Sequence, residues 1–304
     1  MTHENILSSI LLAASLVTFP AHAQGPIFNG VGANNLIDFT TWNMYGSASA
    51  INETPGNGFT YSNLSLTSPG TLGQGGAAFA PNTVTLNFNQ AFTITFDFYI
   101  SPGQPFGGSL LAGEGMTFVL TPDDPSTVNG GGPLAPIGGS DLGYGNSGLS
   151  GLAFAIDTAN DGGEPIFTGQ PVAPSIQILE NGSVIPPLAY TETGLADIRS
   201  YYGGYYQWST TLSYTPSGLD DMQGDLTGTI NQFVGNLSFS VSATVDGTLL
   251  HNLPLYYGFT AGNGVAGDGH HVSSAVPVPE PETWVMLLAG LSLVGFAARR
   301  RRGC

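Results

Sequence analysis

The segment "FTITFDFYI", residues 92–100, decides the fold class. Large apolar residues stand at every second position, and the positions between them hold threonine, aspartate and tyrosine. Because the side chains of a β-strand alternate between two faces, this pattern predicts a strand with one face in a core and the other in water. Six further segments alternate in a similar way between turn-forming residues: 83–89, 115–122, 174–179, 207–216, 236–247 and 253–262.

Many strands with almost no helical periodicity predict an all-β protein, for which a two-sheet jelly-roll sandwich is the simplest arrangement. Only residues 194–202 suggest a helix. The chain has 304 residues, 41% of them hydrophobic, so one domain over residues 24–276 has enough material for a core. Residues 121–143 are too long for a hairpin turn, which predicts a functional loop. Residues 216–235 are interpreted as an insertion between two strands.

The charge of the chain is strongly negative, with a formal net charge of −16 at pH 7. There is no lysine, and only Arg199 lies outside the C-terminal arginine run at residues 299–302. Such a surface repels nucleic acid and anionic lipid, while it suits divalent cations and neutral ligands. The single cysteine, Cys304, excludes an intramolecular disulfide.

Both ends of the chain carry sequences typical of protein export. Residues 1–23 hold an apolar run that ends in Ala-His-Ala, so we expect a signal peptide cleaved before Gln24. The tail, residues 277–304, has an apolar stretch for a single transmembrane helix followed by the arginine run. Its Pro-Glu-Pro motif consists of Pro279, Glu280 and Pro281.

This order closely resembles the PEP-CTERM sorting signal of Gram-negative bacteria. The resemblance implies recognition by an exosortase-type enzyme, removal of the tail, and release to the cell surface or an exopolysaccharide matrix. A permanently membrane-anchored protein is the alternative.

The segment "SGLAFAIDTANDGGEP", residues 150–165, ends an apolar strand in a cluster of oxygen-bearing side chains. The Asp157 and Glu164 carboxylates, the Asn160 amide and nearby carbonyls are hard ligands of the kind that Ca²⁺ selects. A plain turn built from aspartate, asparagine and glycine explains the same letters. Spacing alone leaves both interpretations open.

Several short motifs occur in an order that resembles L-type (legume-type) lectins and their bacterial relatives, over most of residues 28–275. They are "FTITFDFYI", "GEGMTFVLTPDDPS", "GGSDLG", "GLAFAIDTANDGGEP", "PSIQIL" and "LYYGFTAGNGVAGDGHHV". The resemblance implies a two-sheet jelly roll, carbohydrate binding, and a metal loop that supports the sugar-binding loops.

The resemblance also implies roles for individual residues. The calcium ligands would be Asp157, the Ala159 carbonyl, Asn160 and Glu164. The sugar would be bound by Glu114, Gly138, Gly139, Asn160, Asn263 and Gly264. Glu114 and Glu164 replace aspartates of the family, and Ala159 replaces the aromatic residue that stacks on the sugar. Because Ala155 and Ser175 replace the glutamate and histidine of the second metal site, no transition metal is expected.

Other functional classes have weaker support in the sequence. The Glu-x-Asp-x-x-Glu string of laminarinase-type glycosidases on this fold does not occur, so we do not expect an enzyme. His270 and His271 lack any accompanying catalytic motif and are interpreted as loop residues. The sequence therefore predicts a secreted, non-catalytic, calcium-supported protein that binds surface carbohydrate or exopolysaccharide. The alternative is a structural matrix protein that has lost sugar affinity, and a glycoside hydrolase is the third candidate.

Overall fold

The computed structural model describes residues 37–53, 61–103, 114–131, 134–136, 138–139, 141–158, 172–199, 208–218, 222–233, 236–264 and 266–273. A short 3-10 helix, η1 (Phe39–Thr41), comes first. The strands are β1 (Asn43–Gly46), β2 (Ser49–Glu53), β3 (Tyr61–Ser65), β4 (Gly75–Phe79), β5 (Val84–Thr85), β6 (Phe92–Ser101), β7 (Gly115–Thr121), β8 (Leu152–Asp157), β9 (Ser175–Glu180), β10 (Ala189–Glu192), β11 (Trp208–Pro216), β12 (Gln223–Gln232), β13 (Ser238–Asp246), β14 (Pro254–Gly262) and β15 (Gly269–Ser273).

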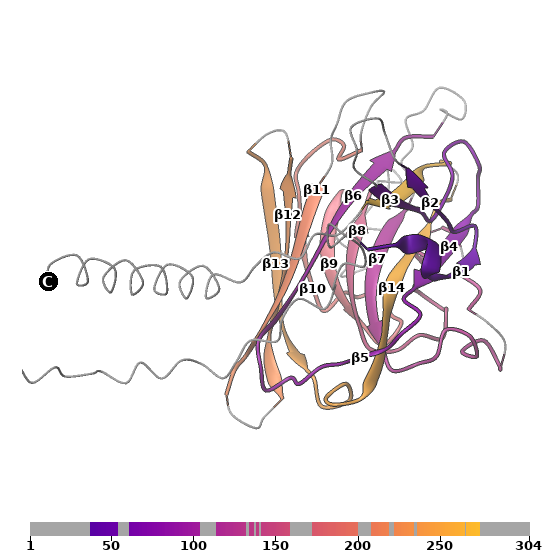
Figure 1. The fold of residues 1–304 in the computed structure, drawn as a ribbon. Helices are drawn as coiled ribbons and strands as arrows, with labels where there is room; N and C mark the ends of the chain where they lie inside the picture. The colour runs from indigo at the N-terminus through magenta and orange to yellow at the C-terminus, as the bar shows by residue number, and fades with distance from the viewer. Residues whose placement is uncertain are drawn as a thin grey trace, which may run out of the picture.

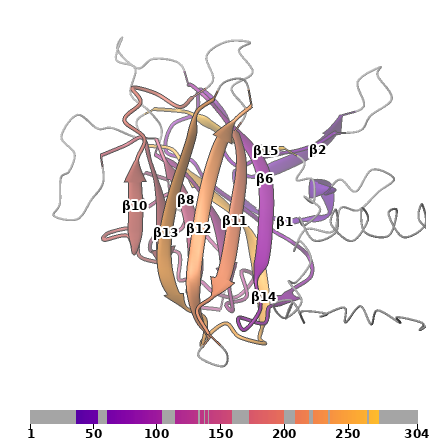
Figure 2. The same cartoon turned by 90° about the vertical axis from the view of Figure 1, so that its left-hand side faces the viewer.

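The strands form two antiparallel sheets packed face to face, which confirms the predicted sandwich (Figure 1). Sheet I has the order β1-β4-β14-β7-β8-β9-β10, and β5 also pairs with β14. Sheet II has the order β13-β12-β11-β6-β15-β3-β2, and its long central strands are seen face-on in Figure 2. Strands that are neighbours in space are often far apart in the chain, so this topology brings distant loops to the same end of the sandwich.

The main core lies between the sheets and is rich in aromatic rings. Phe96 of sheet II stacks on Phe118 of sheet I at 5.7 Å between ring centroids, and it meets Phe259 edge-on at 5.0 Å. All three side chains are buried. Residues 92–100 alternate because they form one strand, β6, whose every second side chain points into this core.

A second apolar layer lies on the outer face of sheet I. The loop that follows β7 folds back over the sheet, and its side chains Leu134, Leu142, Tyr144 and Leu149 form one cluster with the buried outer-face residues Ala77, Phe79, Val119, Ala153, Ala155 and Leu179. Because β8 is covered on both faces, it needs apolar residues at consecutive positions rather than strict alternation. The long loop at residues 121–143 therefore has a packing role in its described part.

Two sequence interpretations of strands were wrong. The strand expected at residues 83–89 is only two residues long, β5, because the chain turns at Asn87 and leaves the sheet. The apolar alternation continues past β5 because Leu86 and Phe88 are still buried. The supposed insertion at residues 216–235 contains a full ten-residue strand, β12, which pairs with strands on both sides. Its apolar alternation is hidden because a glycine, Gly228, occupies an inward position that the Phe154 ring fills from the opposite sheet.

The structure also corrects the expected helix and the expected histidine loop. Residues 194–199, the described part of the expected helix, are irregular. The Asp197 carboxylate accepts a hydrogen bond from the Arg199 backbone N–H at 2.8 Å, a local bond that competes with helix formation. His270 and His271 lie in β15, where His270 is completely buried.

Among the residues that the structure describes, no helix is long and apolar enough to cross a membrane. The expected signal peptide at residues 1–23 and the sorting tail at residues 277–304 lie outside the described residues.

Candidate functional site

One end of sheet I collects the strand ends that carry the predicted site. Cross-strand pairing places Gly262, Gly115, Asp157 and Ser175 in a single row across β14, β7, β8 and β9. Gly262 also pairs with Gly75 at the start of β4. The loops that leave or enter the sheet at this row contain Glu114, Asn263, Gly264 and the start of the predicted metal loop. Gly138 and Gly139 belong to the β7–β8 loop, which leaves the sheet at the other end and folds back over its outer face.

Glu114 precedes this row, and its carboxylate lies against the backbone of Gly264. A Cβ placed on Gly264 would be only 2.5 Å from Glu114 Oε1, so a larger residue there would displace the carboxylate. The next residue, Gly115, has a φ of +138° and no room for a Cβ beside the Ile156 carbonyl. Gly264 thus lets the backbone approach the Glu114 carboxylate, and Gly115 lets β8 approach the start of β7. Both Glu114 and Gly264 are half-buried.

The same turn links Glu114 to the predicted metal loop. The Glu114 carbonyl accepts a hydrogen bond from the Thr158 N–H at 3.0 Å, immediately after the end of β8. The loop that would carry calcium and the residue that would accept sugar hydrogen bonds are therefore joined by one backbone contact. A shift of either loop would be transmitted to the other.

Asp157 is held by a glutamine that the sequence analysis did not single out. Gln177 Nε2 lies 3.0 Å from Asp157 Oδ2 and 3.0 Å from Ser175 Oγ, and the Gln177 side chain is buried. A polar residue in the otherwise apolar segment "PSIQIL" was the available signal. Gln177 lies on the covered outer face of sheet I, paired with Ala155, and a buried amide usually has a specific partner. Gln177 fixes the direction of one Asp157 carboxylate oxygen.

The predicted backbone donors Gly138 and Gly139 reach the same end of the sandwich. A Cβ on Gly138 would be 2.8 Å from the carbonyl oxygens of Gly73 and Gln74, so these two loops touch. The Gly73 N–H in turn donates to the Gly264 carbonyl at 3.1 Å. Four predicted residues, Glu114, Gly138, Gly139 and Gly264, thus belong to one group of adjoining loops.

Asn263 belongs to the same group, but its side chain faces inward. Its Oδ1 accepts from the Gln74 N–H at 2.7 Å, and its Nδ2 donates to the carbonyls of Thr71 and Asp268 at 2.9 and 3.0 Å. The residue is fully buried. In this structure the Asn263 amide holds backbone segments together.

The predicted calcium ligands are only partly described. Asp157 lies at the end of β8, while Ala159, Asn160 and Glu164 lie outside the described residues. Within the described part of the chain, no three His, Cys, Asp or Glu side chains converge as a metal cluster. Ala155 is packed in the outer apolar layer, and the Ser175 hydroxyl contacts Gln177.

Comparison with solved structures identifies proteins with the same fold. The basic winged bean lectin, solved with Tn-antigen, is 20% identical, with 83% of this chain and 98% of that chain covered and a TM-score of 0.55. The winged bean acidic lectin, solved with methyl-α-D-galactose, is 18% identical, with 83% of this chain and 98% of that chain covered and a TM-score of 0.54. Lectin II from Ulex europaeus is 19% identical, with 77% of this chain and 91% of that chain covered and a TM-score of 0.53.

Comparison with protein families supplies the identity of the tail. Residues 277–302 match the model of the PEP-CTERM protein-sorting motif, which confirms the predicted sorting signal. This motif indicates a bacterial protein that is exported, held at the membrane by its tail and processed at the surface. A search of curated proteins finds no match. The chain therefore combines a lectin-like jelly-roll sandwich of the legume type with a C-terminal PEP-CTERM sorting motif.

Proposed function

We propose that the protein is a non-enzymatic carbohydrate-binding protein that uses the loops at the Glu114 end of sheet I. One observation carries the proposal: Glu114, Gly138, Gly139 and Gly264, which are far apart in the sequence, lie in adjoining loops beside the strand end of Asp157. A half-buried carboxylate beside backbone amides offers acceptors and donors together, as a sugar with several hydroxyl groups requires.

The chemistry of the site favours a neutral sugar. The Glu114 carboxylate would accept hydrogen bonds from two hydroxyl groups, and charge-assisted bonds of this kind contribute roughly 1.5–3 kcal/mol each. The backbone N–H groups of the loop at Gly138 and Gly139 would donate to a sugar oxygen. With a net charge of −16 on the chain, an acidic polysaccharide would be repelled.

Calcium fits the donor set at the end of β8. Asp157, the Ala159 carbonyl, Asn160 and Glu164 supply hard oxygen atoms, which Ca²⁺ prefers over softer ligands. When bound, the ion would fix the loop that begins at Thr158. Gln177 would keep the Asp157 carboxylate directed toward that loop, and the Thr158–Glu114 contact would pass the order on to the sugar site.

Replacing Asp157 by alanine is expected to abolish calcium binding, because the mutation removes the only charged ligand on a rigid strand. Isothermal titration of Ca²⁺ into the metal-free protein measures the calcium affinity of the wild type and the mutant. Asp225→Ala is the control, since Asp225 is an exposed aspartate on β12, in the other sheet. An unchanged isotherm in Asp157→Ala would refute the assigned site.

Replacing Glu114 by glutamine keeps the size of the side chain but removes its charge. We expect sugar affinity to fall by about 10- to 100-fold, which corresponds to one charge-assisted hydrogen bond. Glycan-array binding with and without chelator identifies the ligand, and titration of that glycan gives the affinities of both proteins. Equal affinity in Glu114→Gln would exclude this carboxylate as the acceptor.

A structural matrix protein with a degenerate sugar site is the second candidate. Two observations favour this candidate. Both the oxygen and the nitrogen of the Asn263 amide are hydrogen-bonded to backbone groups, and Ala159 has no ring on which a sugar could stack. The absence of any bound glycan in the array, with or without calcium, would support this candidate. In both cases we propose export in a Gram-negative bacterium, tail removal by an exosortase-type enzyme, and a place in the exopolysaccharide matrix.

A further inference from the structure

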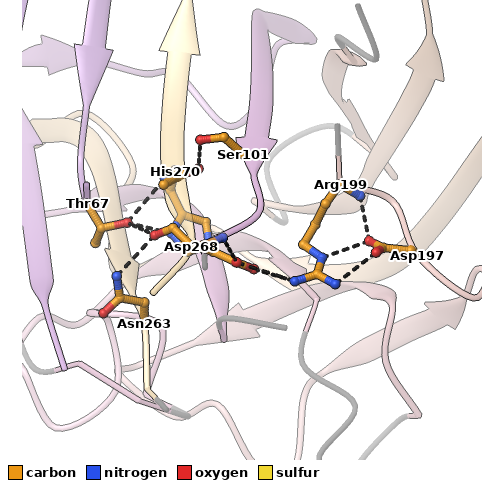
Figure 3. Close-up of polar contacts among 9 residues, drawn as sticks. Thr67, Ser101, Asp197, Arg199, Asn263, Asp268 and His270 are labelled. Atoms are coloured by element: carbon orange, nitrogen blue, oxygen red, sulfur yellow. Dashed lines mark hydrogen bonds and ion pairs between the residues drawn. The ribbon is translucent and has the colours of Figure 1, made fainter. Parts of the chain in front are cut away.

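A buried ion pair lies behind the loop that carries Gly264. Arg199 Nη1 is 3.1 Å from Asp268 Oδ2, and the Arg199 guanidinium also makes a two-pronged contact with Asp197, Nη2 to Oδ2 at 2.8 Å and Nε to Oδ1 at 2.9 Å (Figure 3). The side chain of Arg199 is 4% exposed and that of Asp268 is 0% exposed. Arg199 is the only lysine or arginine in residues 1–298, so no other such cation among them could replace it.

Asp268 joins three other segments to this ion pair. Its Oδ1 accepts a hydrogen bond from the Gly103 N–H at 2.7 Å, just beyond the end of β6. Its backbone carbonyl accepts from the Thr67 hydroxyl at 2.8 Å and from Asn263 Nδ2 at 3.0 Å. Figure 3 shows Asp268 at the centre of these contacts, between Arg199 on one side and Thr67 and Asn263 on the other.

The contacts continue without a gap from Asp268 to the sugar-site carboxylate. Asn263 bonds to Asp268 through its side chain, it fixes Gln74 through Oδ1, and the next residue, Gly264, lies against Glu114 Oε1. A carboxylate buried as deeply as that of Asp268 must keep its cation or change its surroundings, because an unpaired charge is costly in a low-dielectric interior. Arg199 is the cation that lets the Asp268 carboxylate stay buried.

We propose that Arg199, acting through Asp268, is a positioning residue that holds the Gly264 loop against Glu114 without help from a metal ion. The inference deepens the proposed function, on which its binding part rests. It divides the sugar site between two supports. Calcium would order the loop after Asp157, whereas the Arg199–Asp268 pair orders the loop after β14 from the other side.

Hydrogen exchange of the full-length protein tests this division directly. The reporter amides are those of Asn263, Gln74 and Gly103, whose N–H groups bond within the network. We expect chelator to leave their exchange unchanged in the wild type, and Arg199→Met to accelerate it by about tenfold or more through local opening. Arg199→Lys keeps the charge without the two-pronged geometry and should give an intermediate rate; it also serves as the test if Arg199→Met fails to fold.

Tyr214→Phe is the matched control. It removes a buried hydroxyl that donates to the Phe88 carbonyl at 3.0 Å, and Tyr214 pairs with Phe92 at the start of β6, the opposite end from Gly103. Compared at equal global stability, this variant should leave the reporter amides unchanged. Equal acceleration in Tyr214→Phe and Arg199→Met, or none in either, would overturn the positioning role.

Affinity for the best glycan of the array gives the second readout. We expect about tenfold weaker binding by Arg199→Met in saturating calcium, and wild-type affinity in Tyr214→Phe. If the wild type binds no glycan, the proposed function fails, while the exchange rates still decide whether Arg199 orders the loop. Altered exchange with unaltered affinity would overturn the link to the sugar site.

Discussion

Truncation of Phe154 to alanine is expected to lower the free energy of unfolding by about 3–5 kcal/mol, the usual cost of removing a fully buried ring. Phe154 lies in β8, pairs with Phe118 and Ile178 on the neighbouring strands, and is 1% exposed. Its ring crosses the interior of the sandwich and reaches Gly228 in β12. Chemical denaturation followed by circular dichroism measures the loss.

Gly228 gives this prediction an internal check. A Cβ on Gly228 would lie 2.2 Å from Phe154 Cε2, so Gly228→Val should overpack the core and cost about 1–3 kcal/mol in the wild type. In the Phe154→Ala background the valine enters the cavity and should recover part of the lost stability. Strictly additive effects in the double mutant would show that the two positions do not share one space.

The contact between Phe154 and Gly228 also explains why most strands could be predicted from the sequence but β12 could not. Alternation reveals a strand most clearly when its inward positions are apolar, as in β6. In β12 the opposite sheet supplies the bulk at position 228, so the residue there is glycine and the pattern is lost. The space between two facing strands can be filled by a side chain of either strand. The sequence of one strand alone therefore does not show which strand fills it.

The candidate site divides in a similar way. Asp157 could be named because it ends an apolar strand just before a turn, whereas Glu114, which precedes β7, was named because its motif resembles that of L-type lectins. The register that places Gly115, the residue after Glu114, beside Asp157 is a cross-strand property, which no single motif encodes. The contact between Arg199 and Asp268 joins residues 69 positions apart, and its only trace in the sequence is that Arg199 is the single lysine or arginine of the body.

Acidification is expected to destabilise the protein through His270. Burial, together with smaller effects of the neighbouring His271 and Arg199, lowers the pKa of His270 to about 3. Among the described residues, His270 Nε2 has no hydrogen-bond partner, while Nδ1 lies 2.8 Å from the Thr67 hydroxyl. The folded protein therefore keeps this imidazole neutral at a pH where the unfolded chain, with a value near 6.5, binds a proton.

The sign of the effect follows from proton binding in the two states. The contribution of His270 is fully present above pH 6.5 and is lost as the pH falls toward 3, at about 1.4 kcal/mol per pH unit. His271, whose pKa burial lowers to about 4, adds a second loss of the same sign. Asp97 opposes them between pH 6 and 3.8, because burial raises its pKa to about 6 despite a lowering hydrogen bond from Ser209.

Replacing His270 by asparagine separates this effect from general acid unfolding. Asparagine keeps a polar group for Thr67 and does not titrate, so the slope of unfolding free energy against pH should become shallower by about one proton between pH 6 and 4. Denaturant titrations at a series of pH values measure the slopes. Tyr214→Phe, which removes no imidazole or carboxylate, should give a curve parallel to that of the wild type. If the His270→Asn curve is also parallel, His270 is charged in the folded protein, and the buried neutral imidazole described above does not exist in solution.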